Sequence, residues 1–156
     1  MMKTGINGFG RFGLHLLKYW LDRSDECPFQ ILSINDSHLL KEKIFEIINS
    51  DYSVVLNSYK FQLSGSVLQI TSPDGNNHEI NITNENDDKI PWIGEYDLFL
   101  ECTGVNTVRK KCEKFLSGNT KLVVISATSW DSDKTLVYGF NHKDLDLKKD
   151  KIISYG

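Results

Sequence analysis

The sequence of 156 residues lacks the features of a disulfide-rich, zinc-binding or membrane protein. Its three cysteines, Cys27, Cys102 and Cys112, are an odd number without CxxC spacing, which indicates reduced thiols. No apolar run approaches the roughly 18 residues of a membrane span, and the N-terminus lacks the apolar segment of a secretion signal. We therefore expect a cytoplasmic protein that holds no metal and has no membrane partner.

A basic stripe is also missing. The net charge is −3, and the pair Lys148-Lys149 lies between Asp146 and Asp150. These features argue against a nucleic-acid partner. The hydrophobic fraction of 40% and the charged fraction of 25% are typical of a globular domain. We expect one domain over residues 1–156, large enough to bury about two-thirds of the surface of its unfolded chain.

Glycines recur near the N-terminus at the spacing Gly8-x-Gly10-x-x-Gly13, before a helical pattern. Gly8 lets the chain turn sharply out of a strand, and Gly10, which has no Cβ, lets the backbone approach a pyrophosphate. Gly13 shares a helical face with Leu17 and Trp20, where helix and sheet can pack closely. The N–H groups at the start of that helix would then face the diphosphate. This spacing predicts a dinucleotide site.

An acidic residue follows at the distance that such a site requires. Asp36 comes 23 residues after Gly13 and directly after the apolar segment 30–34. An acid at the end of the second strand can accept hydrogen bonds from the ribose hydroxyls of the cofactor. The alternative interpretation is that Asp36 caps a helix that starts near Leu39. Beside the glycines, the ribose role is favoured.

Helical and strand patterns alternate along the chain. We expect a strand up to Asn7, a helix over 10–22, a strand over 30–34 and a helix over 39–49. The other expected elements are an antiparallel hairpin around Ser72-Pro73-Asp74-Gly75, a loop over 84–89, strands over 96–100, 122–126, 135–138 and 152–154, and a helix over 107–116. This order predicts an α/β fold of the Rossmann type, with a doubly wound, mainly parallel sheet and an antiparallel hairpin insertion.

Several segments together resemble one family, the phosphorylating glyceraldehyde-3-phosphate dehydrogenases. The segments are Gly5-Ile6-Asn7-Gly8-Phe9-Gly10-Arg11-Phe12-Gly13, Ile34-Asn35-Asp36, Glu101-Cys102-Thr103-Gly104-Val105, Val123-Val124-Ile125-Ser126-Ala127, Gly139-Phe140-Asn141-His142 and Lys151-Ile152-Ile153-Ser154. They occur in the family's order across essentially the whole chain. The resemblance implies a glycolytic, NAD-dependent enzyme that oxidises and phosphorylates an aldehyde through a cysteine thioester.

The resemblance also implies site residues. The backbone at Arg11 and Phe12 would meet the pyrophosphate, Asp36 the adenine ribose, Thr103 and Gly104 the adenosine side, and Ser126 the nicotinamide side. The complete set of expected NAD-binding residues is Asn7, Gly8, Phe9, Gly10, Arg11, Phe12, Gly13, Asp36, Thr103, Gly104 and Ser126. Ser126 could instead be a strand-end hydroxyl with ordinary partners.

The chain departs from the family pattern at the adenine slot. It has Glu85-Asn86 where the family often has Arg-Asp, and Asn106 where the family carries an aromatic residue. An aromatic stack contributes about 1 kcal/mol beyond area burial, so we expect looser adenine binding rather than none.

The larger departure is at the end of the sequence, which stops two residues before the family's nucleophilic cysteine. We expect that the catalytic domain is absent, that no catalytic residue lies in this chain and that the fragment alone is inactive. Cys102 is expected to be a small buried residue rather than a substitute nucleophile. His15 is expected to be exposed.

Two alternatives remain open. The chain could derive from an erythrose-4-phosphate dehydrogenase, or it could be a non-enzymatic module that binds NAD or mediates an interaction.

Asp36 would repel the 2′-phosphate of NADP by about 4 kcal/mol at about 4 Å and an effective dielectric near 20, so NAD is the expected cofactor. Because the family forms tetramers, self-association is also expected.

Overall fold

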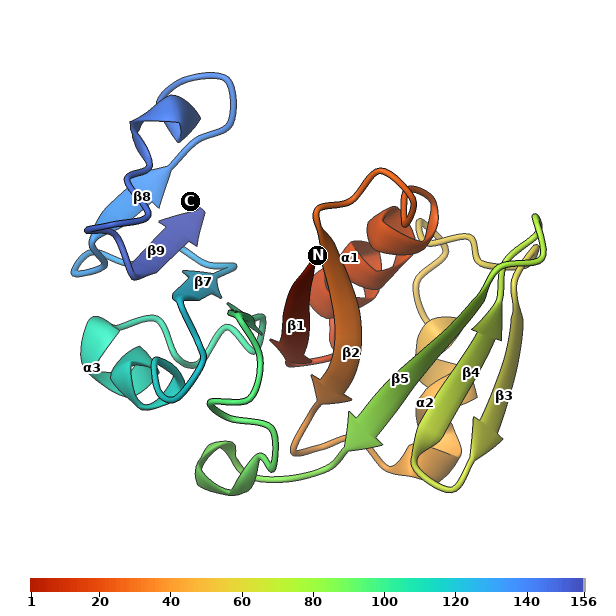
Figure 1. Ribbon diagram of the computed structural model, residues 1–156. Coiled ribbons are helices and arrows are strands. Elements are labelled where there is room, and N and C mark those ends of the chain that lie inside the picture. The colour runs from red at the N-terminus through yellow and green to blue at the C-terminus, as the bar shows by residue number, and fades with distance from the viewer. Residues whose placement is uncertain (156) are drawn as a thin grey trace.

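A computed structural model describes residues 1–155 of the protein, and its centre is a single nine-stranded sheet (Figure 1). The strands are β1 (Met2–Asn7), β2 (Phe29–Asn35), β3 (Lys60–Ser64), β4 (Val67–Thr71), β5 (Asn77–Thr83), β6 (Leu98–Glu101), β7 (Leu122–Ile125), β8 (Lys134–Leu136) and β9 (Ile152–Tyr155). The helices are α1 (Arg11–Leu21), α2 (Ile44–Ile48) and α3 (Arg109–Cys112), with 3₁₀ turns η1 (Lys41–Lys43), η2 (Asp87–Lys89), η3 (Glu113–Phe115) and η4 (His142–Asp144).

The strands lie in the order β3-β4-β5-β2-β1-β6-β7-β9-β8. All pairs from β5 to β8 are parallel, whereas β3, β4 and β5 pair antiparallel. The turn between β4 and β5 closes with a hydrogen bond from the Gly75 N–H to the Ser72 carbonyl (2.9 Å), and Gly75 has a positive φ of 90°. The predicted Rossmann-type α/β fold with an antiparallel insertion is therefore confirmed, and the insertion extends the parallel sheet because β5 also pairs with β2.

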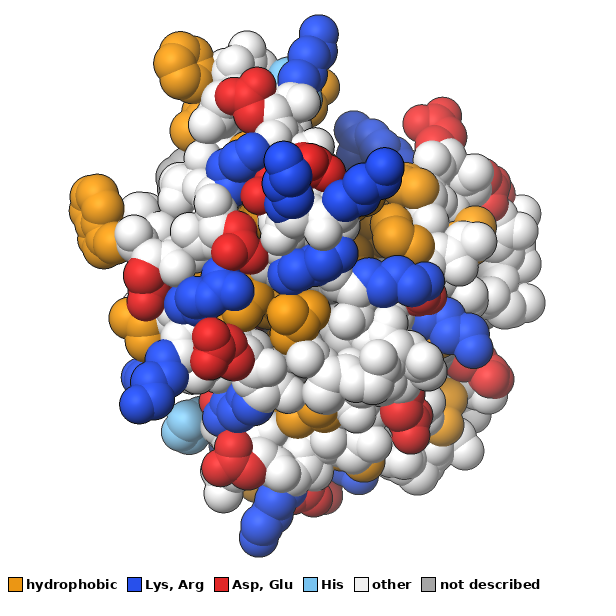
Figure 2. Space-filling model, turned by 60° about the vertical axis from the view of Figure 1, so that its left-hand side comes forward, with side chains coloured by type: hydrophobic (Ala, Val, Ile, Leu, Met, Phe, Trp, Pro, Cys, Tyr) orange, Lys and Arg blue, Asp and Glu red, His pale blue; other side chains and the backbone are white. Residues whose placement is uncertain are grey.

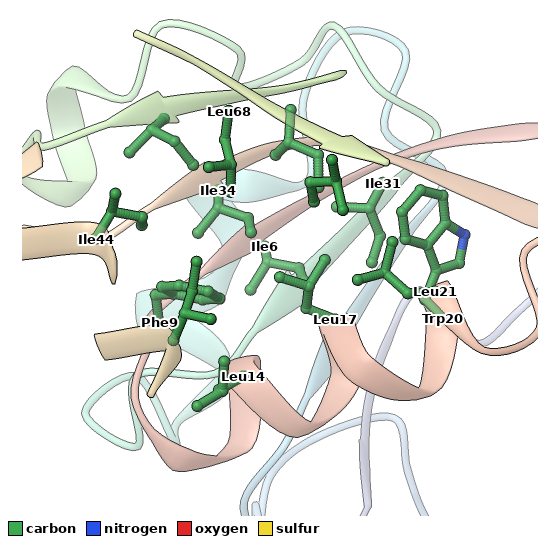
Figure 3. Close-up of a cluster of buried hydrophobic side chains, with 14 of the residues drawn as sticks. Ile6, Phe9, Leu14, Leu17, Trp20, Leu21, Ile31, Ile34, Ile44 and Leu68 are labelled. Carbon is green, nitrogen blue, oxygen red and sulfur yellow. The ribbon is translucent and has the colours of Figure 1, made fainter. Parts of the chain in front are cut away.

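One face of the sheet is covered by α1 and α2. Leu17, Trp20 and Leu21 of α1 point toward Ile6, Ile31 and Ile34 of the central strands, as Figure 3 shows, and Leu14 belongs to the same buried cluster. The α1 positions recur at spacings of three and four residues, which places them on one side of a helix. Because α1 starts four residues after the end of β1, this packing fixes the start of the helix beside the end of the strand.

The opposite face carries a second core beneath α3 and η3. Phe99 stacks on Phe115 with ring centroids 4.1 Å apart, and Trp92 packs against Phe99 at 5.2 Å. Trp92 reaches the sheet at Gly5, where a Cβ would lie 2.3 Å from the indole ring. Neighbouring residues of a strand point to opposite faces, so Gly5 meets this core while Ile6 meets the core under α1.

Two expected helices are shorter than predicted. The helical pattern over 107–116 forms only α3 and η3, because Val108 is extended (φ −113°, ψ 142°) and the last turn tightens to 3₁₀. The pattern over 39–49 forms η1 and α2. The expected loop over 84–89 contains the turn η2.

The surface of the C-terminal half mixes charges of both signs, and Figure 2 shows Lys and Arg side chains among Asp and Glu. Several form ion pairs, such as Lys121 with Asp97 (2.7 Å) and Lys134 with Asp150 (3.1 Å). Within residues 1–155, no helix has the length and apolar composition needed to cross a membrane.

Candidate functional site

The glycine-rich segment between β1 and α1 forms a tight loop in which two glycines are required by close contacts. Gly8 has a φ of 98°, and a Cβ there would lie 2.6 Å from the backbone of Cys102 and Thr103. A Cβ on Gly13 would lie 2.2 Å from the Gly8 carbonyl oxygen. By contrast, a Cβ on Gly10 would meet no atom within 4 Å. Gly8 and Gly13 thus hold the loop together, and Gly10 leaves open space in front of it.

The first amides of α1 face that open space without partners. The Leu14 N–H donates to the Gly10 carbonyl (3.0 Å), whereas the N–H groups of Arg11, Phe12 and Gly13 donate to no atom of the residues that the structure describes. Unpaired amides at the start of a helix, together with the positive end of its dipole, form a binding site for anionic groups. Gly10 precedes them as a cap that has no side chain.

Asp36 joins the end of β2 to this loop. One carboxylate oxygen accepts the N–H of Phe9 (2.8 Å), and the other accepts the N–H of His38 (2.9 Å). Phe9 itself is buried in the core, 2% exposed, so it contributes its N–H and its packing to the loop. The side chain of Asp36 stays 22% exposed, which leaves room for a further donor. Asp36 does not cap a helix that starts near Leu39, the alternative interpretation of this residue, because the helical segments begin only at Lys41 and Ile44.

These elements surround a cavity of about 500 Å³ at the carboxyl ends of β1, β2 and β6. Its lining residues are Gly8, Gly10, Asp36, Ser37, His38, Asn86, Asp87, Asp88, Cys102, Thr103, Val105, Asn106 and Lys114. We call it the acidic cavity because Asp36, Asp87 and Asp88 line it. Open α/β sheets bind ligands at this edge, where the connections from the central strands diverge to opposite faces.

Four polar side chains connect the walls of the acidic cavity. Asn7 lies beside Glu101 in the register of β1 and β6, and its amide donates to Glu101 (2.9 Å) and to Asp87 (3.0 Å). The Asn106 amide donates to the same two carboxylates, at 3.1 Å for Glu101 and 2.7 Å for Asp87. Glu101 also accepts the N–H of Thr103 (2.8 Å) and its hydroxyl. Two amides thus bridge two carboxylates, and we call these four residues the amide–carboxylate cluster.

The two carboxylates of the cluster titrate differently. Glu101 is 1% exposed, and burial raises its pKa above the ordinary value although the bonds from Thr103, Asn7 and Asn106 oppose this effect. Burial also acts to raise the pKa of Asp87, but the hydrogen bonds from Asn106 and Asn7 and the nearby Lys114 hold it below its usual range. Asp87 is therefore an ionised acceptor near neutral pH.

A second, apolar hollow of about 400 Å³ lies on the other side of Cys102. It is lined by Phe12, Leu16, Phe29, Leu98, Leu100, Cys102, Val124, Ser126 and Tyr155. Because Cys102 lines both spaces, the acidic cavity and this apolar hollow are neighbours across the end of β6. Burial raises the pKa of the Cys102 thiol to about 12, with a contribution from nearby Glu101, so it is not an activated nucleophile.

The predicted site residues divide between these two spaces. Gly8, Gly10, Asp36 and Thr103 line the acidic cavity, and Phe12 and Ser126 line the apolar hollow. Gly104 follows with a positive φ of 74°, and Asn7 lies beneath the acidic cavity in the cluster. The Arg11 side chain points to solvent, 87% exposed, near Asp51 (3.8 Å).

Sequence reasoning missed the roles of Glu101 and Asp87 and was wrong about His15. That histidine is half-buried rather than exposed, and its Nε2 lies 3.4 Å from Asp51 and 3.2 Å from the Ser53 hydroxyl. The sequence held one usable signal for the cluster, because Asn7 and Glu101 both end central strands and parallel strands end at the same edge.

Comparison with known proteins gives a consistent picture. Residues 2–109 match the family model described as glyceraldehyde 3-phosphate dehydrogenase, NAD binding domain. The chain is 32% identical to glyceraldehyde-3-phosphate dehydrogenase 1 of Bacillus cereus, with 99% of this chain and 44% of that protein covered. It is 34% identical to glyceraldehyde-3-phosphate dehydrogenase 4 of Caenorhabditis elegans, with 97% and 44% covered. The chain thus spans less than half the length of these relatives.

Proposed function

The chain belongs to the glyceraldehyde-3-phosphate dehydrogenase family, through its NAD-binding domain, and from this premise we propose that residues 1–156 bind NAD across the acidic cavity and the apolar hollow. The observation that carries the proposal is the set of unpaired amides at the start of α1, in front of the open space that Gly10 leaves. The diphosphate of NAD needs such donors. A side chain on residue 10 would fill the space in which the diphosphate would bind.

The two spaces match the two halves of a dinucleotide. Asp36 at the acidic cavity offers a partly exposed carboxylate to ribose hydroxyls, and Thr103 lines the same wall. The apolar hollow next to Phe12 has the character that a flat aromatic ring requires. We therefore assign the adenosine half to the acidic cavity and the nicotinamide half to the apolar hollow, with Ser126 near the second ribose.

Membership of the family supports a biochemical role for the chain. When bound, NAD supplies the hydride acceptor of an aldehyde oxidation. This chain would bind and orient the dinucleotide, while the thiol nucleophile and the phosphate-binding groups would come from the rest of a longer enzyme. We propose that the complete activity is the NAD-dependent, phosphorylating oxidation of glyceraldehyde 3-phosphate in glycolysis. Self-association of the protein also remains a prediction.

The first experiment titrates the ¹⁵N-labelled chain with NAD and follows the amide resonances. We expect those of residues 8–13 and Asp36 to shift, and an NAD concentration of about 100 times the Kd to stabilise the fold by about 2.7 kcal/mol. AMP is the matched ligand control, because it should move the resonances of the acidic cavity without those of Ser126. If no resonance of residues 8–13 moves at millimolar NAD, the proposal fails.

Two other functions remain as alternatives. An erythrose-4-phosphate dehydrogenase would share this cofactor site, and a non-enzymatic NAD-binding module would need nothing more. Sequencing of the transcript separates enzyme from module, because a reading frame that continues through a cysteine-containing catalytic segment favours the enzyme. We expect the purified chain to show no dehydrogenase turnover by itself. Measurable turnover would contradict the proposal that this chain only binds NAD and that the catalytic groups lie elsewhere in the enzyme.

A further inference from the structure

The far end of the acidic cavity, beyond Asp36, carries polar groups whose hydrogen-bonding capacity is already partly used. Asn106 is 5% exposed and donates both hydrogens of its amide, one to Asp87 and one to Glu101. An amide nitrogen has only two hydrogens, so this nitrogen has none left to donate. Its orientation is determined by Asp87, because this ionised carboxylate only accepts hydrogen bonds.

The side-chain oxygen of Asn106 is the free atom of that group. It accepts no hydrogen bond from the residues that the structure describes, and it is not among the fully buried atoms that lack a partner. Asn106 is one of the residues that line the acidic cavity, and its oxygen is not fully buried. A residue that is only 5% exposed thus keeps one unused acceptor.

Asp87 adds a second acceptor beside it. The carboxylate accepts hydrogen bonds from Asn7 (3.0 Å) and Asn106 (2.7 Å), and the Lys114 ammonium lies 3.6 Å from it as an ion pair. A carboxylate offers about four lone-pair positions, so at least one stays available. The side chain is 28% exposed and lines the same cavity. The fixed groups at this end of the cavity are therefore acceptors.

The donors at this end are on more exposed side chains. The Lys114 ammonium lies between Asp88 (2.9 Å) and Asp87 (3.6 Å) and forms ion pairs with both carboxylates. His38 is 96% exposed, and Ser37 and Asn86 are also exposed. A ligand that needs a side-chain hydrogen-bond donor at this end would have to bind to groups that are already ion-paired or hydrated.

We propose that Asp87 and Asn106 select the purine of the dinucleotide, accepting hydrogen bonds from the exocyclic amino group of adenine and disfavouring a purine with a carbonyl oxygen at that position. The inference rests on the proposed NAD-binding function and identifies which base that site takes. A carbonyl oxygen would face the Asn106 oxygen and the Asp87 carboxylate with no hydrogen between them, which is unfavourable for all three atoms.

The test compares NAD with nicotinamide hypoxanthine dinucleotide, which has a carbonyl oxygen in place of the exocyclic amino group and a hydrogen on the adjacent ring nitrogen. Calorimetry on the purified chain should show NAD binding at least about tenfold tighter, the scale of one hydrogen bond made or lost in a partly desolvated site. Equal affinities would overturn the inference and leave the proposed function intact. Failure of both ligands to bind would overturn the proposed function and the inference together.

Variants assign the selectivity to side chains. Asp87→Asn adds an amide donor at the cavity wall and should bring the ratio of the affinities for NAD and for nicotinamide hypoxanthine dinucleotide closer to one. Asn106→Leu removes the acceptor oxygen and should lower the same ratio. Glu79→Gln is the control, because this exposed residue of β5 also loses one charge but lies outside the acidic cavity. An unchanged ratio in both cavity variants would overturn the assignment, and the wild-type comparison remains decisive if either variant fails to fold.

Discussion

The Asp36 carboxylate accepts the main-chain N–H of Phe9 at 2.8 Å, which ties the end of β2 to the glycine-rich loop before α1. The aromatic ring of Phe9 is buried beneath α1 and α2, so the loop is held from below by packing and from the side by this hydrogen bond. The acid proposed to contact the ribose therefore also shapes the loop proposed to contact the diphosphate. Changes at Asp36 should affect both contacts.

Replacement of Asp36 tests the choice between NAD and NADP. The wild-type chain should bind NAD more tightly than NADP, because the carboxylate would repel a 2′-phosphate by about 4 kcal/mol at an effective dielectric near 20. Asp36→Asn should weaken NAD binding about tenfold, through one lost charge-assisted hydrogen bond, and narrow the NAD/NADP ratio. Calorimetry with both cofactors measures this ratio, and equal wild-type affinities would contradict the prediction.

Alanine at two glycines of the loop should give opposite results. In Gly13→Ala the new methyl group would lie 2.2 Å from the Gly8 carbonyl oxygen, and we expect a loss of about 1–3 kcal/mol in the free energy of unfolding. Gly10→Ala meets no atom within 4 Å and should keep wild-type stability. It should nevertheless bind NAD at least about tenfold more weakly, because the methyl group fills the approach to the amides.

Urea denaturation and NAD titration of both variants separate these effects. Wild-type stability of Gly13→Ala would show that the close contact is not required. Wild-type NAD affinity of Gly10→Ala would argue against a diphosphate at the start of α1.

Truncation of a buried aromatic residue tests the core under α3. Phe115 is fully buried and stacked on Phe99, so Phe115→Ala should lower the free energy of unfolding by about 3–5 kcal/mol. Phe140→Ala is the matched control, because Phe140 is 87% exposed and its loss should change stability by less than about 0.5 kcal/mol. Thermal and urea denaturation measure both, and similar losses in the two variants would show that the second core is not packed as described.

The buried carboxyl of Glu101 predicts a specific pH dependence. Burial raises its folded-state pKa above the ordinary value of 4.5, so the folded protein retains a proton that the unfolded chain has released. The contribution of Glu101 to stability therefore declines as the pH rises from about 4.5 toward the raised folded-state pKa. In Glu101→Gln this decline should be absent, so wild type should lose stability relative to the variant across that interval.

Urea denaturation of wild type and Glu101→Gln at closely spaced pH values from 4 to 8 measures the difference. A difference that stays constant over this range, or that changes in favour of wild type as the pH rises, would contradict the raised pKa. Thr103 provides an independent readout, since its N–H resonance should shift over the same pH interval.

Local patterns in the sequence were sufficient for the sheet and the loop. The glycine spacing was sufficient to predict the loop, in which the close contact of Gly13 is with Gly8, a few residues away, although that of Gly8 is with the distant Cys102 and Thr103. The helix α1 was predicted from its regular apolar spacing. The shortness of α3 was not predicted, because the extended conformation of Val108 depends on its surroundings as well as on its own propensity.

The amide–carboxylate cluster as a whole could not be predicted from local sequence patterns. It depends on the register that places Asn7 beside Glu101 and on the turn η2 that brings Asp87 to them, 80 residues along the chain from Asn7. His15 was misjudged for the same reason, since its partner Asp51 lies 36 residues away on a segment without a periodic pattern. Contacts of this kind arise from tertiary packing and leave no local signature.

The position of Cys102 has a consequence for substitutions at the end of β6. This residue belongs to the walls of both the acidic cavity and the apolar hollow. Cysteine has a small side chain, so a larger residue at this position would take up space where the two cavities adjoin. One substitution there should therefore reduce the room for both halves of the proposed dinucleotide.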